Sequence, residues 1–588
     1  MMDTQCRRGE TTMERCYGAV CFFPLEASAP RFFGFSEFLA GLALMVLAWT
    51  TADVRYRFRI RTAPLPLQGL TFFVVATVGG LSLLTDLWRA EQWLVPRGNL
   101  FTPATWQALL GGSFLLTFLT WAWFAFIRPP VYGKLNAQRF AQALYRIVLK
   151  GSPDELAIIA EELTFSAAPL VSYATDLGRL KNYHIMRDEV PRKRVSKVEA
   201  YANDLLLLLG DKRLCRSIVA VSPGTALAIF QEIQEMKKFG IQVETFGCNI
   251  VTEALLNADS FLFNETESYE SGLIGYHKPL SQAIFSNYEM VENIGTLLDP
   301  NIDAGGKWTA AQLGAYCRAV KLTLGSYAKG GYRGHSFVLY RAKSNIEHAA
   351  SDVYLLDGTD EISFDDQVLA RLRVVIEFIV DAVSILDEHK LSGELQLRIR
   401  KTENGGLGTF YDHLAEMIFE VIFAASAVTS PHSQCWWVQH NTVWSSLFNF
   451  NRLQTTVGKI VKFKVRRLMY DEIVRMHSSP NFKGAKILGF CLNVMGLKLG
   501  NPTYDRDSRA LHRAVLAWTK RNFSWLNSYN HRVAEASLVD SLTYEPANQR
   551  LVKTYAAGGL RREPTYVYLD LDPLQDSTTL RSSGSDQE

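Results

Sequence analysis

The sequence predicts a multi-pass α-helical membrane region with three transmembrane helices, then a cytoplasmic α/β domain and a mostly helical C-terminal domain. Three observations predict this order. Long apolar runs occupy the first 130 residues, a central stretch alternates between strand-like and helix-like patterns, and the remainder repeats apolar residues at helical spacing. The expected boundaries are an N-terminal tail at 1–31, a transmembrane region at 32–130, a helical linker domain at 135–215, an α/β domain at 216–360, a mainly helical domain at 361–574 and a disordered tail at 575–588.

Composition narrows the class of protein. The 588 residues are enough for roughly three or four domains. A net charge of +3 gives no global argument for nucleic-acid binding, although it does not exclude nucleic acid as a local partner. Eight cysteines without a C-x-x-C motif do not form a disulfide framework in so long a chain.

The three expected spans cover about 32–52, 65–85 and 107–127, each close to the roughly 20 apolar residues that a bilayer requires. The second and third runs carry no charge, and the first contains only Glu37. Transporters usually carry several buried ionisable groups within their spans. We therefore expect a membrane anchor rather than a single-chain transporter. Small residues recur in the spans, among them Gly69, Gly79 and Gly111, and would let such an anchor form a homo-oligomer.

The third span ends in "WAWFAFIRPPVYGK", which places aromatic residues before a charge and two prolines. Trp121 and Trp123 are expected at the membrane interface, Arg128 in the headgroup region, and the prolines end the helix. The loop after the first span, "RYRFRIR", is rich in arginine. The positive-inside rule therefore predicts that the N-terminus lies outside and that the C-terminal region is cytoplasmic. We expect the membrane to be a plasma membrane, the inner membrane of a bacterium.

The α/β prediction comes from residues 217–246. "SIVAVS" and "IQVETF" look like strands on either side of a helix, which is the pattern of a parallel βαβ unit. Ser222, Gly224 and Thr225 lie where the first strand would meet the helix, and free backbone N–H groups at such a point bind phosphate. The alternative is ordinary helix capping, since neither common glycine-rich phosphate motif occurs.

The stretch "KGGYRGHSF" is the preferred region for an anionic ligand such as a nucleotide. Glycines let the backbone approach a ligand closely, and cationic neighbours can hold an anion. The predicted ligand-binding residues are Lys329, Gly330, Gly331, Arg333 and His335. The alternative is a glycine turn that leads into a strand.

Catalytic candidates are few. Arg179 and His184 stand five apart, the spacing of the Arg–His pair in the HEPN type of ribonuclease, but such pairs often arise by chance. His335 is the other candidate for chemistry on a phosphodiester in nucleic acid or a lipid headgroup. No hydrolase or zinc-protease motif occurs, no metal site is expected, and no cofactor is indicated.

A further stretch, 421–451, lacks Lys, Arg, Asp and Glu but is rich in tryptophan, and "VKFKVR" follows with a period of two. Together they suit a lipid surface or nucleic acid, or else a tryptophan-rich core beside a strand with a basic face. The leading functional hypothesis is a membrane-tethered sensor or effector that binds an anionic ligand. The alternatives are a membrane-anchored phosphodiester hydrolase and a non-enzymatic membrane scaffold.

Overall fold

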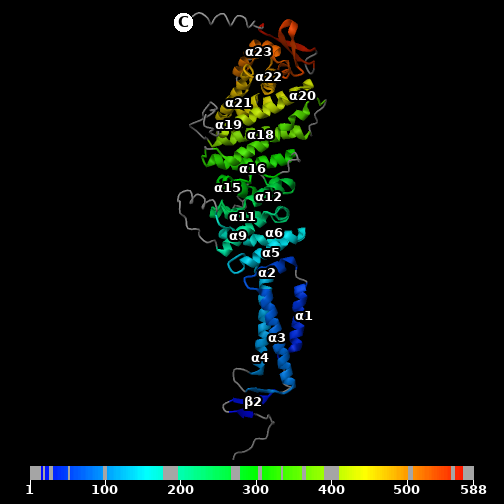
Figure 1. Ribbon diagram of the computed structural model, residues 1–588, viewed down its shortest axis with the longest axis vertical. Coiled ribbons are helices and arrows are strands. Elements are labelled where there is room, and N and C mark those ends of the chain that lie inside the picture. The colour runs from blue at the N-terminus through cyan, green and yellow to red at the C-terminus, as the bar shows by residue number, and fades with distance from the viewer. Residues whose placement is uncertain are drawn as a thin grey trace, which may run out of the picture. The chain divides into compact units, whose positions relative to one another are not determined.

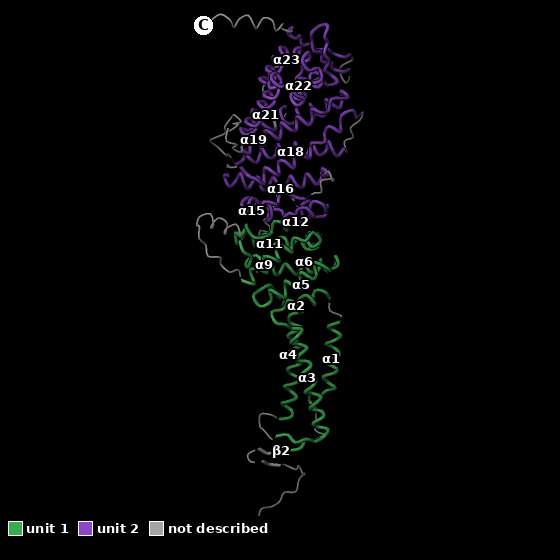
Figure 2. The backbone as a smooth tube through the Cα atoms, viewed as in Figure 1, with its two compact units in different colours: residues 1–246 green, residues 247–588 purple. Residues whose placement is uncertain are grey.

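The computed structural model describes residues 15–17, 20–25, 31–50, 53–96, 102–176, 196–265, 279–301, 308–332, 335–359, 366–389, 409–449, 451–500, 507–557 and 563–573. The chain divides into two compact units, residues 1–246 and residues 247–588 (Figure 2). Helices predominate in both units, and short strands occur near the two ends of the chain (Figure 1).

Unit 1 begins with a small sheet and the apolar helices. Its first elements are β1 (Arg15–Tyr17), β2 (Val20–Pro24), α1 (Phe35–Thr50), α2 (Val54–Thr62), α3 (Leu67–Ala90), β3 (Leu94–Pro96), α4 (Pro103–Ala122) and the π-helix η1 (Trp123–Ile127). The helices that follow are named here the proximal body: α5 (Ala137–Lys150), α6 (Pro153–Leu163), the 3₁₀ turn η2 (Thr164–Ser166), α7 (Ala167–Tyr173), α9 (Lys197–Leu209), α10 (Lys212–Val221) and α11 (Pro223–Met236). The three strands form one antiparallel sheet in the order β1-β2-β3.

Among the described residues, three helical stretches are long and apolar enough to cross a membrane: Leu67–Ala90, Pro103–Ile127 and Pro153–Tyr173. The first two coincide with the second and third predicted spans. The third lies in the proximal body, and half of its apolar window is buried inside the protein. The first predicted span forms α1, whose 16 residues extend only about 24 Å at 1.5 Å per residue.

The apolar helices pack closely through glycine. A Cβ atom on Gly79 of α3 would lie 2.7 Å from the ring of Phe38 in α1, and one on Gly41 would lie 2.8 Å from Phe114 in α4. The end of α1 is also tied by polar contacts, because the Phe35 amide donates to Asp86 Oδ2 of α3 at 2.9 Å. Small residues therefore set the spacing of this helical bundle.

Unit 2 is a succession of packed helices. Its elements are α12 (Glu244–Leu256, which begins within unit 1), α13 (Phe261–Asn264), α14 (Leu280–Phe285), α15 (Tyr288–Ile294), α16 (Ala310–Lys329), α17 (Phe337–His348), η3 (Ser351–Leu356), α18 (Gln367–Glu388), α19 (Phe410–Ala425), α20 (His432–Trp436), η4 (Trp437–Asn449), η5 (Asn451–Leu453), α21 (Thr456–Arg475), α22 (Phe482–Met495), α23 (Arg509–Tyr529), α24 (His531–Glu535), β4 (Leu542–Glu545), η6 (Pro546–Asn548), β5 (Arg550–Tyr555) and β6 (Thr565–Asp570). Most helix contacts join elements that are close in sequence, as in α16 with α18, α19 with α21 and α21 with α22 (Figure 1). The three strands form an antiparallel sheet in the order β4-β5-β6.

The predicted α/β domain is wrong, because the described part of 216–360 is helical. "SIVAVS" belongs to α10, where Leu214, Cys215, Ile218 and Val219 are buried at the spacing of one helical turn. "IQVETF" runs into the start of α12 instead of forming a strand. The run of β-branched residues was too short to separate a strand from the buried face of a helix.

Two other stretches of this range have a strand-like pattern in the sequence but are helical. "HSFVLYRA" leads into α17, and "SDVYLLDG" contains the 3₁₀ helix η3. "VKFKVR" lies within α21, and its lysines are buried against acidic partners, Lys462 against Asp507 and Lys464 against Asp412. The alternating apolar and basic residues therefore do not form a strand with a solvated basic face. The tail predicted at 575–588 lies outside the described residues.

Candidate functional site

The junction between the apolar helices and the proximal body is organised by α2. This helix starts at Asp53, whose carboxylate accepts a hydrogen bond from the Val54 amide at 2.6 Å. Its apolar face is buried, with Phe58 edge-on to Phe140 of α5 and Ile60 packed in a cluster with Trp121. Because apolar residues fix one face, the arginines of α2 project from its other faces, toward the body and toward solvent.

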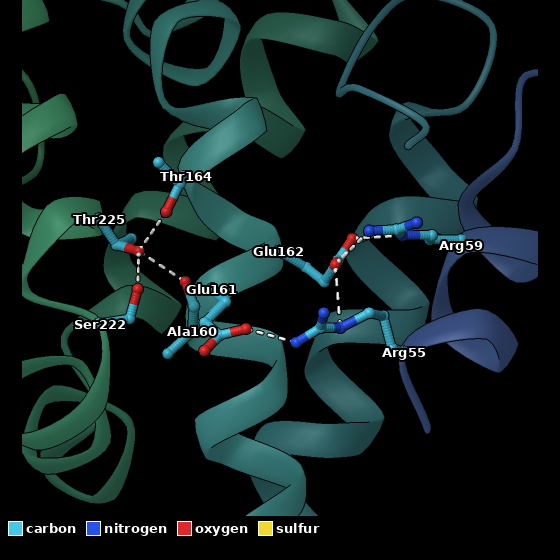
Figure 3. A network of polar contacts seen from close by, with 8 residues as sticks. All are labelled: Arg55, Arg59, Ala160, Glu161, Glu162, Thr164, Ser222 and Thr225. Carbon is cyan, nitrogen blue, oxygen red and sulfur yellow. Dashed lines mark hydrogen bonds and ion pairs between the residues drawn. The ribbon is translucent and has the colours of Figure 1, made fainter. Parts of the chain in front are cut away.

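Arg59 makes the central polar contact of this junction (Figure 3). Its guanidinium forms a two-pronged pair with Glu162 of α6, with Nε to Oε2 at 2.8 Å and Nη2 to Oε1 at 2.7 Å. The remaining Nη1 donates to the Ala125 carbonyl in η1 at 3.0 Å. Both charged side chains are buried. One residue of α2 therefore holds a body helix and the end of the last apolar helix together.

Arg55, one turn earlier, makes a weaker version of the same contact. It pairs with Glu161, and its Nε lies 3.4 Å from Glu162 Oε1 (Figure 3). The Arg55 and Glu161 side chains are 36% and 45% exposed. Water screens such a pair, which usually contributes no more than about 1 kcal/mol. Glu161 thus provides a natural comparison with Glu162 on the same helix.

The predicted phosphate loop takes part in helix packing. Thr225 Oγ1 donates to the Ala160 carbonyl at 2.6 Å and lies 2.6 Å from Thr164 Oγ1 and 3.0 Å from Ser222 Oγ (Figure 3). Thr225 is fully buried, whereas Gly224 is exposed with open space beside it. The hydroxyl groups of this loop bond the protein itself, and ligand binding by Ser222, Gly224 and Thr225 stays a prediction.

The glycine-rich stretch follows the end of α16. Lys329, Gly330 and Gly331 are exposed, and Gly331 has a φ of 68°, which favours glycine. Arg333 lies outside the described residues. The carbonyl groups at the end of a helix carry partial negative charge, which opposes an anion there. The cationic character of this stretch therefore depends on its side chains alone.

His335 lies in an aromatic and imidazole cluster. Its ring centroid is 5.6 Å from those of Tyr340 and His413. Burial lowers the pKa of His335, and the neighbouring His413 lowers it further, so the ring favours its neutral form. Its Nδ1 is buried without a hydrogen-bond partner among the residues that the structure describes. Arg179 and His184, the other catalytic candidates, lie outside those residues.

The aromatic interface needs one correction. Trp121 is only 2% exposed and packs with Ile60, Ala63, Leu67 and Ala125, so its indole faces protein. Trp123 is 47% exposed, and Arg128 just beyond η1 is exposed too, and their position at a membrane interface stays a prediction. The sequence pattern located the end of the helix but not which aromatic residue faces outward.

A polar pocket at this junction was not predicted. It has a volume of about 340 Å³ and is lined by the end of α2, the start of α3 and one face of α5. Its cationic residues are Arg61, Arg139 and Arg146. Arg139 and Arg146 stand seven apart, two helical turns, and so share one face of α5. That spacing was a readable signal, but Arg61 joins them only through the fold.

Across the described ranges, no group of three or more His, Cys, Asp or Glu side chains is placed to hold a metal ion. Comparison of the chain with protein-family models, with curated proteins and with solved structures finds no match in any of the three. The function is therefore argued from the geometry of the chain itself.

Proposed function

We propose that the protein is a membrane-tethered sensor or effector in which α2 couples the membrane spans to the proximal body. The observation that carries this proposal is the buried Arg59, which contacts Glu162 of α6 and the Ala125 carbonyl of η1 at the same time. A movement of α6 must either carry α2 and the end of the last span with it or break a buried ion pair. Removing one partner of such a pair typically costs about 3–5 kcal/mol.

The orientation proposed is that of the positive-inside rule, in a bacterial plasma membrane. Arg55, Arg57, Arg59 and Arg61 lie on α2, which packs against η1 and α5. Arg128 follows directly on η1. Five arginines therefore gather at this end of the apolar helices, whereas Arg31 and Arg89 lie toward the other end. The end with more arginines is proposed to be cytoplasmic, with the N-terminus outside.

Three spans are proposed: α1, α3 and the continuous α4–η1. Exposed side chains on α3 and α4 are largely apolar, among them Phe72, Phe73, Leu84, Leu116 and Leu119. Exposed apolar surface of this extent suits lipid contact better than water. The stretch Pro153–Tyr173 is assigned to the body instead, because Glu161 and Glu162 within it pair with the arginines of α2.

The coupling is tested with a matched pair of neutral substitutions in the full-length protein in lipid nanodiscs. Glu162→Gln keeps the shape of the side chain but leaves the Arg59 charge buried without its counter-charge. We expect amide hydrogen exchange to accelerate in α6, α2 and η1 together, by about ten-fold or more, because a buried unpaired charge is strongly destabilising.

Glu161→Gln is the control. It also removes one negative charge from α6, but Glu161 belongs to a half-exposed ion pair with Arg55. Its exchange pattern should stay within about two-fold of the unmodified protein. Faster exchange confined to α6 in the Glu162→Gln variant, with α2 and η1 unchanged, would show that the span and the body are not coupled through Arg59.

A second candidate, a scaffold for a partner complex, is favoured by unit 2. Its helices pack mainly on neighbours in sequence, and stacks of this kind present extended surfaces to other proteins. Titration calorimetry of the full-length protein with a panel of nucleotides separates the two candidates. Binding of any nucleotide supports the sensor. No heat across the panel, together with a stable complex that copurifies from detergent extracts, favours the scaffold.

A further inference from the structure

We propose that the pocket lined by Arg61, Arg139 and Arg146 binds the phosphate of an anionic membrane phospholipid. The three arginines come from two helices, α2 and α5, and face one polar cavity of about 340 Å³. Gln68 and Gln142 add further hydrogen-bond donors to its wall. This inference does not depend on the coupling through Arg59, which involves a different arginine and a different face of α2.

Among the described residues, no carboxylate balances the charge in the pocket. In the part of the chain that the structure describes, none of the three arginines lies within ion-pair distance of a carboxylate. Arg139 Nη2 donates to the carbonyls of Pro64 at 2.5 Å and Leu135 at 3.0 Å, which fixes its guanidinium beside the turn between α2 and α3. Carbonyl contacts leave its positive charge intact. A monoanionic or dianionic group in the cavity would meet three converging cations.

The start of α3 adds to this potential. Leu67, Gln68 and Gly69 of its first turn line the cavity. The Leu67 amide donates to the Leu65 carbonyl at 2.8 Å, and the amides of Gln68 and Gly69 lack partners within the helix. The aligned peptide dipoles of a 24-residue helix also favour negative charge at this end. A Cβ atom on Gly69 would meet nothing within 4 Å, so the space beside the backbone is open to a ligand.

The position of the pocket favours a lipid over a soluble anion. Leu70, Phe72 and Phe73 lie within about one turn of the cavity on α3, and all three side chains are exposed. A phosphate in the pocket would leave the acyl chains free to run along this apolar surface. Basic pockets at the cytoplasmic ends of spans are typical binding sites for anionic headgroups.

The test uses full-length protein in a nonionic detergent and native mass spectrometry. The probes are dioleoyl phosphatidylglycerol, dioleoyl phosphatidylcholine with the same acyl chains, and inorganic phosphate. We expect retention of phosphatidylglycerol but not of phosphatidylcholine. Arg61→Gln/Arg146→Gln should weaken that binding roughly ten- to thirty-fold. Both side chains are exposed, so the variant should keep its helix content, which circular dichroism checks.

The control is Arg57→Gln/Arg128→Gln, which removes the same charge from exposed residues near the same end of the spans but outside the pocket. Its affinity for phosphatidylglycerol should change less than about three-fold. If both double variants lost phosphatidylglycerol binding equally, the lipid would be held by diffuse attraction to the basic surface, which would contradict the proposed pocket. If inorganic phosphate were retained as strongly as phosphatidylglycerol, the pocket would bind a soluble anion, which would contradict the proposed lipid ligand.

Discussion

At the scale of single residues, Lys553 of β5 is a buried lysine whose surroundings predict a pH dependence of stability. It is fully buried, and its ammonium donates to the Leu492 and Asn493 carbonyls at the end of α22. It also lies 5.2 Å from the ring centroid of Trp436. Burial lowers the pKa of Lys553 to about 7, because desolvation disfavours the charged form.

This lowered pKa predicts a pH dependence of stability. Above about pH 7 the folded protein has released a proton that the unfolded chain keeps up to its ordinary lysine pKa. Unfolding therefore takes up a proton between these values, and the free energy of unfolding rises with pH from about 7 toward 10. Lys553→Met should remove this rise, measured as the thermal midpoint of full-length protein in detergent at pH 7, 8, 9 and 10.

Lys520→Met serves as the control, because the Lys520 side chain is half-exposed beside Asp572, whereas that of Lys553 is buried. Its midpoint should follow that of the unmodified protein across the series. If the thermal midpoint rose with pH equally in Lys553→Met and Lys520→Met, groups other than Lys553 would cause the pH dependence.

Residue-level features of the site were only partly predictable. The arginine-rich stretch after the first apolar run was visible in the sequence and indicated a cytoplasmic face. The partner of Arg59 was not visible, because Glu162 stands 103 residues away and nothing local marks it as buried. Trp121 and Trp123 look equivalent in sequence, and only the packing of α2 against the last span distinguishes them.

At the scale of elements, long helices were predictable and short strands were not. The helix at Gln367–Glu388 was clear from the regular spacing of buried residues such as Leu372, Val375 and Ile379. In α21, by contrast, Lys462 and Lys464 looked solvated, yet acidic residues from remote parts of the chain neutralise both. Such tertiary partners override a local alternation of apolar and charged residues.

Close helix contacts predict which glycines matter. A Cβ atom on Gly489 of α22 would lie 2.4 Å from the Ser537 carbonyl oxygen, a backbone atom that cannot move aside on its own. Gly489→Ala should therefore lower the free energy of unfolding by about 1–3 kcal/mol, the usual effect of overpacking. A lower thermal midpoint of the full-length protein measures this loss.

Gly325→Ala is the matched control on α16, where an added Cβ meets nothing within 4 Å. It should raise stability by about 0.5–1 kcal/mol through the better helix propensity of alanine. Equal midpoints for the two variants would show that α22 is not packed tightly against the chain after α24.

At the scale of the whole molecule, the apolar helices of unit 1 predict that the protein associates with a membrane. The Leu67–Ala90 and Pro103–Ile127 helices bury only 28% and 17% of their apolar windows within the chain. The remaining surface is too apolar to face water at low cost. We expect the full-length product to sediment with membranes in a detergent-free lysate and to enter the supernatant only with detergent.

The direction of insertion follows from the distribution of charge rather than from the length of the apolar helices. Arg55, Arg57, Arg61 and Arg128 lie at the end of the helices next to the proximal body. Moving these charges across the bilayer is costly, so that end should stay cytoplasmic. An impermeant protease applied to intact spheroplasts should remove an N-terminal tag and spare a C-terminal one until the cells are lysed. Removal of the C-terminal tag first would reverse the topology, and both the lipid pocket and the coupling helix α2 would then face the outside.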